Sequence, residues 1–322
     1  MGPAARFSPD VTRRRRGAAL LALAAVAVAI VAVIASALAS GDDASPNKGA
    51  EAKAAATPPP PPTLPDGSRR VFPDHRVVGF YGNPKADELG ELGIGPPSKV
   101  ARKLRRQARG YNRRSRPVLP AFELISTIAD ADPGPSGKYR SRMPDGMIRR
   151  YLRAARKAKA ILILDIQPGH SDFFEETIRL EKWLREPDVH LALDPEWRML
   201  GGEKPGTVIG SVTARELNAT TAWLDMLVAK HNLPQKLVVI HQFTLDMIQN
   251  RPRLKQREHL AITLNADGFG DQPNKLSKYR AFTRGQKKFA NGYKLFYRED
   301  INLMTPKEVM RMRPRPDFIV YE

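Results

Sequence analysis

The stretch Ala160-Ile-Leu-Ile-Leu-Asp-Ile-Gln167 is a continuous apolar run that ends in polar residues, and His190-Leu-Ala-Leu-Asp-Pro-Glu196 repeats this pattern further along the chain. Short runs of this kind predict buried strands of a parallel sheet. Because side chains alternate along a strand, Asp194 and Glu196 are expected to lie on one side, with Cα atoms about 6 to 7 Å apart. Both strands therefore predict carboxylates at their carboxyl ends.

The same pattern recurs along most of the chain. The predicted strands are 75–83, 118–126, 160–167, 190–196, 237–244, 260–267, 293–299 and 317–322. Amphipathic patterns between them predict helices near 98–114, 144–157, 171–184, 213–231, 245–253, 275–290 and 305–310. Thr213 and Glu216 form a predicted capping box at the fourth of these helices.

Regular alternation of strands and helices predicts parallel strands joined by right-handed crossovers. A set of eight such strands in about 250 residues predicts a closed (β/α)8 barrel of the TIM type. An open, doubly wound α/β sheet is the alternative, but the Gly-rich nucleotide-binding loop expected after an early strand is missing from the sequence.

The first 70 residues are expected to lie outside the barrel. Four arginines, Arg13 to Arg16, precede an uncharged run over 17–39 that is long enough to span a bilayer of about 30 Å. We therefore expect a cytoplasmic basic tail (1–16), a transmembrane signal-anchor (17–39), an Ala- and Pro-rich linker (40–70) and an extracytoplasmic barrel (71–322). Cleavage as a signal peptide near Ala39, which gives a secreted protein, is the alternative.

The composition narrows the possible functions. The chain has no cysteine, which excludes disulfides, cysteine-ligated metals and an acylated lipoprotein anchor. Its net charge of +19 favours anionic partners. Because the barrel is predicted to be extracytoplasmic, we expect anionic envelope polymers or lipid headgroups and no nucleic acid. The dense basic cluster from Lys99 to Arg116 is expected to be a solvated helix face.

Functional residues of such barrels lie at the carboxyl ends of the strands. Side-chain parity predicts that one ring of polar and aromatic residues lines this mouth: Tyr81, Asn83, Glu123, Asp165, Gln167, Asp194, Glu196, Gln242, Asn265, Asp267, Tyr297 and Glu299. Tyr81 and Trp197 add aromatic faces of the kind that stack on sugar rings.

The Asp-x-Glu motif at the end of the fourth strand, with Asp165 ending the third, resembles the barrel glycosidases of the chitinase and family-25 lysozyme kind. The resemblance implies that Glu196 is the general acid, that Asp194 orients a substrate acetamido group or tunes the acid, and that Asp165 completes the catalytic set. The other residues of the ring, with Trp197, would then bind substrate.

This resemblance implies a membrane-tethered, extracytoplasmic glycosidase-like barrel that acts on or binds cell-envelope polysaccharide such as peptidoglycan. The alternative function is a non-catalytic envelope protein whose basic surface holds anionic wall polymers or lipid headgroups.

No metal or other cofactor is expected. His75, His170, His190, His231 and His259 show no metal-ligand spacing, and His241 is expected to face the helices because its parity is opposite to that of Gln242. A hard cation held by Glu123, Asp165 and Asp267 is the alternative. A metal-dependent hydrolase would require three oxygen or nitrogen ligands to converge on one point.

Overall fold

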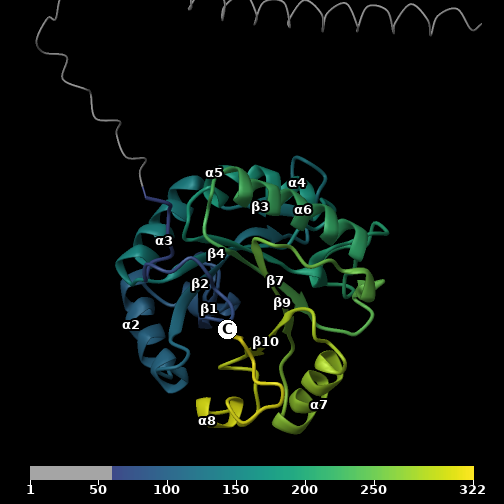
Figure 1. The fold of residues 1–322 in the computed structure, drawn as a ribbon. Coiled ribbons are helices and arrows are strands. Elements are labelled where there is room, and N and C mark those ends of the chain that lie inside the picture. Colours follow the sequence, from purple (N-terminus) through teal and green to yellow (C-terminus); the bar gives the residue numbers. More distant parts are fainter. Residues whose placement is uncertain (1–59) are drawn as a thin grey trace, which may run out of the picture. The chain divides into compact units, whose positions relative to one another are not determined.

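Eight parallel strands close into a barrel in the computed structural model, which describes residues 60–322. The strands follow the order β1-β11-β10-β9-β7-β5-β4-β2, and β1 also pairs with β2, which completes the circle. Figure 1 shows the helices forming an outer ring around the barrel. The predicted TIM-type barrel is therefore confirmed. Its strands are β1 (Arg76–Gly82), β2 (Val118–Ala129), β4 (Ile161–Ile166), β5 (Val189–Leu193), β7 (Lys236–Gln242), β9 (Leu260–Ala266), β10 (Ala290–Leu295) and β11 (Phe318–Tyr321).

Two apolar layers hold the barrel together. One lies inside the barrel, where buried side chains such as Val77, Ile163 and Val239 pack together. The other lies between the strands and the helices and includes Phe122 and Leu224. Because both faces of each strand are buried, the strands read as continuous apolar runs. Such runs are easy to recognise in a sequence, but they carry little information about which side chains point inwards.

The outer ring consists of α2 (Pro97–Ala108), α3 (Asp145–Lys157), α4 (Phe173–Arg179), α5 (Glu181–Leu184), α6 (Ala214–Lys230), α7 (Gln272–Thr283) and α8 (Pro306–Val309). Helix α2 packs on the barrel through Val100 and Leu104, whereas Lys99, Arg102 and Arg105 are exposed. The predicted solvated basic helix is confirmed for Lys99 to Arg106, whereas Arg113 and Arg116 of the predicted cluster lie beyond the end of α2.

The amino terminus of α6 shows half of the predicted capping box. The Oγ1 atom of Thr213 accepts a hydrogen bond from the N–H of Glu216 at 3.2 Å. The carboxylate of Glu216 instead accepts hydrogen bonds from the N–H of Phe173, at 3.0 Å, and from Nε of Arg198, at 3.1 Å. Glu216 therefore ties α6 to α4 and to the loop after β5. A complete capping box is present at α8, between Thr305 and Glu308.

The helix predicted over residues 245–253 is wrong. This segment contains the short strand β8 (Ile248–Gln249), which pairs with β6 (Val212–Thr213), and a 3₁₀ turn at Arg251–Arg253. Asn250 has a left-handed backbone with φ of 57°, and the next turn contains Pro252, which has no N–H donor. Both features prevent an α-helix from continuing here. A further short strand, β3 (Arg140–Arg142), pairs antiparallel with the end of β2.

Residues that precede β1 cover the amino-terminal end of the barrel. Leu64 and Val71 are buried and belong to the same apolar cluster as Leu119 and Leu237 inside the barrel. The side-chain oxygen of Gln235 accepts the N–H of Val71 at 2.8 Å and fixes this segment in place. The barrel therefore carries a plug, residues 64–71, at the end opposite to the carboxyl ends of its strands.

The predicted transmembrane segment, residues 17–39, lies outside the described residues and stays a prediction. Within residues 60–322, no helix combines the length and the hydrophobicity needed to cross a bilayer.

Candidate functional site

Ionisable side chains gather at the carboxyl ends of the barrel strands. Four of them lie on strands and three follow a strand directly: Glu123 (β2), Asp165 (β4), His241 (β7), Lys294 (β10), Asp194 (after β5), Asp267 (after β9) and Glu322 (after β11). All except Glu322 are buried. The closed barrel thus brings groups from distant parts of the chain into one mouth cluster.

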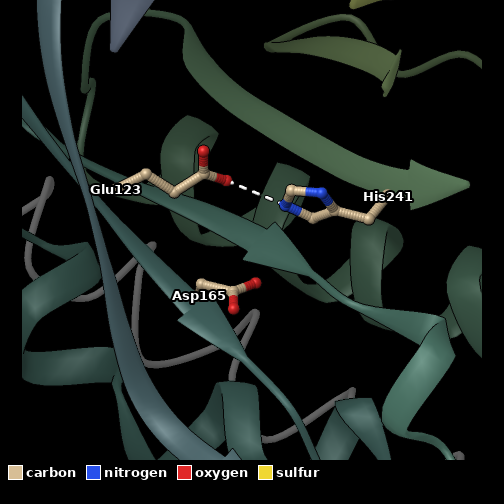
Figure 2. Close-up of side chains that lie close together, drawn as sticks. All are labelled: Glu123, Asp165 and His241. Atoms are coloured by element: carbon tan, nitrogen blue, oxygen red, sulfur yellow. Dashed lines mark hydrogen bonds and ion pairs between the residues drawn. The ribbon is translucent and has the colours of Figure 1, made fainter. Parts of the chain in front are cut away.

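Glu123, Asp165 and His241 form the central trio of this cluster; Figure 2 shows their side chains lying close together. Each offers one ligand atom, and these three atoms all lie within 4.8 Å of one another. Nε2 of His241 lies 3.0 Å from Oε1 of Glu123. This donor set of two carboxylates and one imidazole has the size and chemistry to hold a metal ion.

His241 is fixed from its other side by Asp267. Nδ1 of His241 lies 2.8 Å from Oδ2 of Asp267, whose Oδ1 accepts the N–H of Gly268 at 2.7 Å. A carboxylate that accepts the Nδ1 proton leaves Nε2 to face Glu123 and Asp165. This carboxylate–histidine arrangement is the usual support of a metal-ligating histidine.

Asp165 is oriented by β1. The hydroxyl of Tyr81 donates to Oδ2 of Asp165 at 3.0 Å, and Nε2 of Gln167 donates to the Tyr81 hydroxyl at 3.1 Å. Nζ of Lys294 lies 3.9 Å from the centre of the Tyr81 ring and forms ion pairs with Asp267, at 3.2 Å, and with Glu322, at 2.6 Å. The positive charge of Lys294 therefore faces carboxylates outside the central trio.

Two carboxylate oxygens at the centre have no hydrogen-bond partner. Oε2 of Glu123 and Oδ1 of Asp165 are both buried, and no donor reaches either of them within the described structure. A buried carboxylate oxygen that gives up water without gaining a donor costs roughly 1 to 3 kcal/mol. Oδ1 of Asn265, on the neighbouring strand β9, is unpartnered in the same way.

Burial and mutual repulsion perturb the acids of the mouth. Burial raises the pKa of Asp165 to about 7, with His241 acting against this shift and Glu123 adding to it. Burial likewise raises the pKa of Glu196 to about 7, and the charge of Asp267 adds to the effect. For His241, burial lowers the pKa, but Glu123 and Asp267 together raise it well above its ordinary value. The mouth thus contains more negative charge than its own cations balance.

The stability of the cation-free protein is expected to fall as the pH rises from 4.5 to about 7. Glu196 has a pKa of about 7 in the folded chain and 4.5 in the unfolded chain, so the folded state holds more protons in this interval. Raising the pH then favours unfolding. Urea unfolding in EDTA at about pH 5 and about pH 8 measures the difference. Glu196→Gln should weaken the dependence, and an unchanged slope in this variant would contradict the assignment.

The two carboxylates of the Asp-x-Glu motif occupy a turn and not a strand. Strand β5 ends at Leu193, and residues Pro195–Trp197 form a 3₁₀ turn whose amino terminus is capped by Asp194. Oδ1 of Asp194 accepts the N–H of Glu196 at 3.3 Å. Asp194 is buried, whereas Glu196 is half-buried and lies close enough to Asp267 and Lys294 to feel their charges. Glu196 is thus the partly exposed acid beside the buried cluster.

Several predicted residues lie outside the cluster. Tyr297 stacks on Tyr321 on the helix side of the barrel, and Glu299 is exposed on the loop after β10. The side chain of Asn83 accepts the N–H of Lys85 within its own loop, at 2.9 Å, and that of Gln242 donates to the carbonyl of Thr244, at 3.2 Å.

Trp197 is half-buried and ends the 3₁₀ turn after β5. Tyr81, Gln167, Asn265 and Asp267 do join Glu123, Asp165 and His241.

The prediction that His241 faces the helices is wrong. Leu237 and Val239 pack inside the barrel, so His241 points inwards with them. The strand predicted at 293–299 in fact spans Ala290–Leu295, which places Lys294 inside and leaves Tyr297 beyond the strand. The shifted bounds of β10 explain why Lys294 was not predicted, and the wrong inward face of β7 explains why His241 was not predicted. The apolar side chains of β7 gave no alternation from which the inward face could be read.

Comparisons with known proteins add little to this geometry. No family model matches the chain, and no curated protein matches it. A solved structure, the spore coat polysaccharide biosynthesis protein SpsE of Bacillus subtilis, matches with a TM-score of 0.43 and 12% identity over 77% of this chain and 59% of that chain. The match thus spans less than two thirds of that protein.

The predicted membership of the chitinase and family-25 lysozyme kind is contradicted: no family model of that kind matches the chain, and the solved structure found is that of a polysaccharide biosynthesis protein. The motif that carried the resemblance also differs, since Glu196 lies in a 3₁₀ turn after the strand. The predicted glycosidase function is therefore withdrawn, and the predicted polysaccharide, membrane and anionic-polymer partners stay predictions.

Proposed function

We propose that the chain is a divalent-cation-dependent barrel enzyme, in which Glu123, Asp165 and His241 hold the cation and Glu196 exchanges a proton with the substrate. The observation that carries this proposal is the convergence of Glu123, Asp165 and His241, whose ligand atoms lie within 4.8 Å of one another. One oxygen of each carboxylate, Glu123 Oε2 and Asp165 Oδ1, is buried and unpartnered. A cation held by these three residues would supply the positive partner that the two carboxylates lack.

The charge of the cluster supports a cation at this place. Glu123, Asp165, Asp194 and Asp267 are buried carboxylates, and the buried cationic side chain among them is Lys294, apart from His241 itself. Several buried carboxyl groups close to one another cannot all stay ionised without a positive counter-charge. A divalent cation supplies two positive charges that offset this excess and favour the ionised form of Asp165.

The donor atoms indicate which cations fit. Carboxylates suit Mg²⁺ and Mn²⁺, imidazole suits Zn²⁺ and other first-row ions, and the chain has no thiolate to offer. We therefore expect Mn²⁺ or Zn²⁺. Three protein ligands leave coordination positions open for water or for a substrate oxygen.

Such a site suits reactions in which a proton moves while negative charge develops on an oxygen. The cation would polarise a substrate carbonyl or hydroxyl oxygen or lower the pKa of a bound water. Glu196, half-buried at the edge of the cluster with its pKa raised to about 7, is poised to give or take the proton near neutral pH. Asn265 offers an unpartnered acceptor oxygen for a substrate hydroxyl. A small substrate rich in hydroxyl or carbonyl groups fits these features best.

Cation content tests the proposal directly. The full-length protein, loaded with Mn²⁺ or Zn²⁺ and passed through gel filtration, should retain about one ion per chain by mass spectrometry of the metal. Glu123→Gln and His241→Gln should retain little or none. Glu299→Gln is the matched control, because Glu299 is an exposed carboxylate on a mouth loop. Full cation retention by Glu123→Gln would refute the assignment.

A further inference from the structure

A second polar site lies at the other end of the barrel. A cavity of about 520 Å³ opens beside the first residue of β1 and the residues before β2 and β11. Six of the residues that line it are cationic: Arg76, Arg113, Arg116, Lys307, Arg311 and Arg315. Its remaining lining residues are Ser115 and Met310, so no carboxylate lines the cavity.

The positive charges of this arginine cavity are only partly balanced. Arg116 forms an ion pair of 2.7 Å with Asp317, which lies next to β11. Burial lowers the pKa of Arg76, and the neighbouring charge of Arg116 lowers it further. Asp317 therefore offsets about one of the six charges, and the remaining cations repel one another.

Backbone carbonyl groups hold three of the guanidinium groups in fixed positions. Nε of Arg76 donates to the carbonyl of Pro316 at 3.1 Å, Nε of Arg116 to that of His75 at 2.7 Å, and Nε of Arg315 to that of Met310 at 3.1 Å. Because each of these contacts uses Nε, the Nη groups of Arg76 and Arg315 keep their donors for another partner.

Arg76 is the strongest sign of a missing ligand. It is 4% exposed and lines the cavity, yet the one hydrogen bond of its side chain within the described residues is that from Nε. A buried guanidinium has five N–H donors and is rarely left without an anionic partner. Within the described residues, no carboxylate forms an ion pair with it at 4.0 Å or less.

We propose that the arginine cavity binds an anion that carries at least two phosphate groups. Guanidinium groups match phosphate oxygens in bidentate pairs, and fixed guanidinium groups lose little entropy on binding. The cavity is larger than one phosphate requires, and its excess of about five charges favours a multiply charged ligand over a single carboxylate or chloride. This site is independent of the cation site at the mouth.

Calorimetric titration of the full-length protein with inorganic pyrophosphate tests the proposal. The protein is first freed of divalent cations with EDTA and dialysed, so that pyrophosphate cannot bind through a cation at the mouth. We expect saturable binding at about one pyrophosphate per chain, at least about tenfold tighter than that of orthophosphate at physiological salt. Absence of saturable pyrophosphate binding would overturn the proposal.

Charge-removing variants locate the binding. Arg76→Gln should weaken pyrophosphate binding by about tenfold or more, since a hydrogen-bonded charge pair is lost. Arg315→Gln, at an exposed and therefore tolerant position, should weaken it severalfold and keeps the test valid if Arg76→Gln does not fold. Arg153→Gln on α3 is the matched control, with the same charge change at an exposed residue away from the cavity. An equal loss in Arg153→Gln would mean that only the net charge attracts the anion, and would refute the site.

Discussion

Saturating Mn²⁺ or Zn²⁺ is expected to raise the melting temperature of the protein by roughly 5 to 10 °C. A ligand present at about 100 times its Kd adds about 2.7 kcal/mol to the free energy of unfolding, and about 1 kcal/mol shifts the melting temperature of a domain of this size by about 2 to 4 °C. The gain should arise mainly from the relief of the buried, unpartnered oxygens of Glu123 and Asp165. Thermal unfolding followed by circular dichroism, with cation and with EDTA, measures it.

The variant Asp165→Asn distinguishes two interpretations of the mouth cluster, a cation site and a structural ion-pair network. Burial opposes the ionisation of Asp165, and one of its oxygens has no donor. An amide at this place should therefore leave the cation-free protein at least as stable as the wild type above about pH 7, while the response to the cation is lost. A variant that is strongly destabilised in EDTA and still responds to the cation would contradict the proposed role of Asp165.

Glu176→Ala is expected to destabilise the fold by about 3 to 5 kcal/mol, because it breaks a buried ion pair and leaves a charge uncompensated. Glu176, at 1% exposure, accepts hydrogen bonds from Nε of Arg140 at 2.8 Å and from Nε of Arg142 at 2.7 Å. These contacts bind the short strand β3 to α4. The equilibrium midpoint of urea unfolding measures the loss.

The neighbouring residue provides the control for this prediction. Glu175 lies on the same helix, its side chain is 39% exposed, and its ion pairs with Arg142 and Arg179 are long, at 3.8 and 3.7 Å. Glu175→Ala should cost no more than about 1 kcal/mol, as exposed pairs do. Similar losses in both variants would show that burial does not govern the energetics of this cluster.

The fold could be predicted from sequence because each barrel strand is an apolar run of the right length between amphipathic helices. The ends of the elements were harder to place, because they depend on single contacts. The predicted strand 190–196 ends at Leu193, where Asp194 caps a 3₁₀ turn. The predicted helix 245–253 fails at Asn250, whose left-handed backbone the apolar pattern does not reveal.

The candidate site could be predicted only in part. Carboxylates at strand ends, such as Glu123 and Asp165, stand out in sequence because they interrupt apolar runs. His241 and Lys294 did not, since the parity of a strand that is buried on both faces has to be guessed from a single polar residue. The predicted parity placed Gln242 inside the barrel and His241 on the helix side. The predicted site therefore lacked the imidazole nitrogen that completes the cation ligands.

The plug at residues 64–71 limits access to the barrel to the carboxyl ends of its strands. Since Leu64 and Val71 close the amino-terminal end and apolar side chains fill the interior, a substrate that reaches Glu123 and His241 has to enter from the side of Glu196. The product has to leave from the same end of the barrel. Threading of a long polymer through the barrel is thereby ruled out, and product should compete directly with substrate for entry.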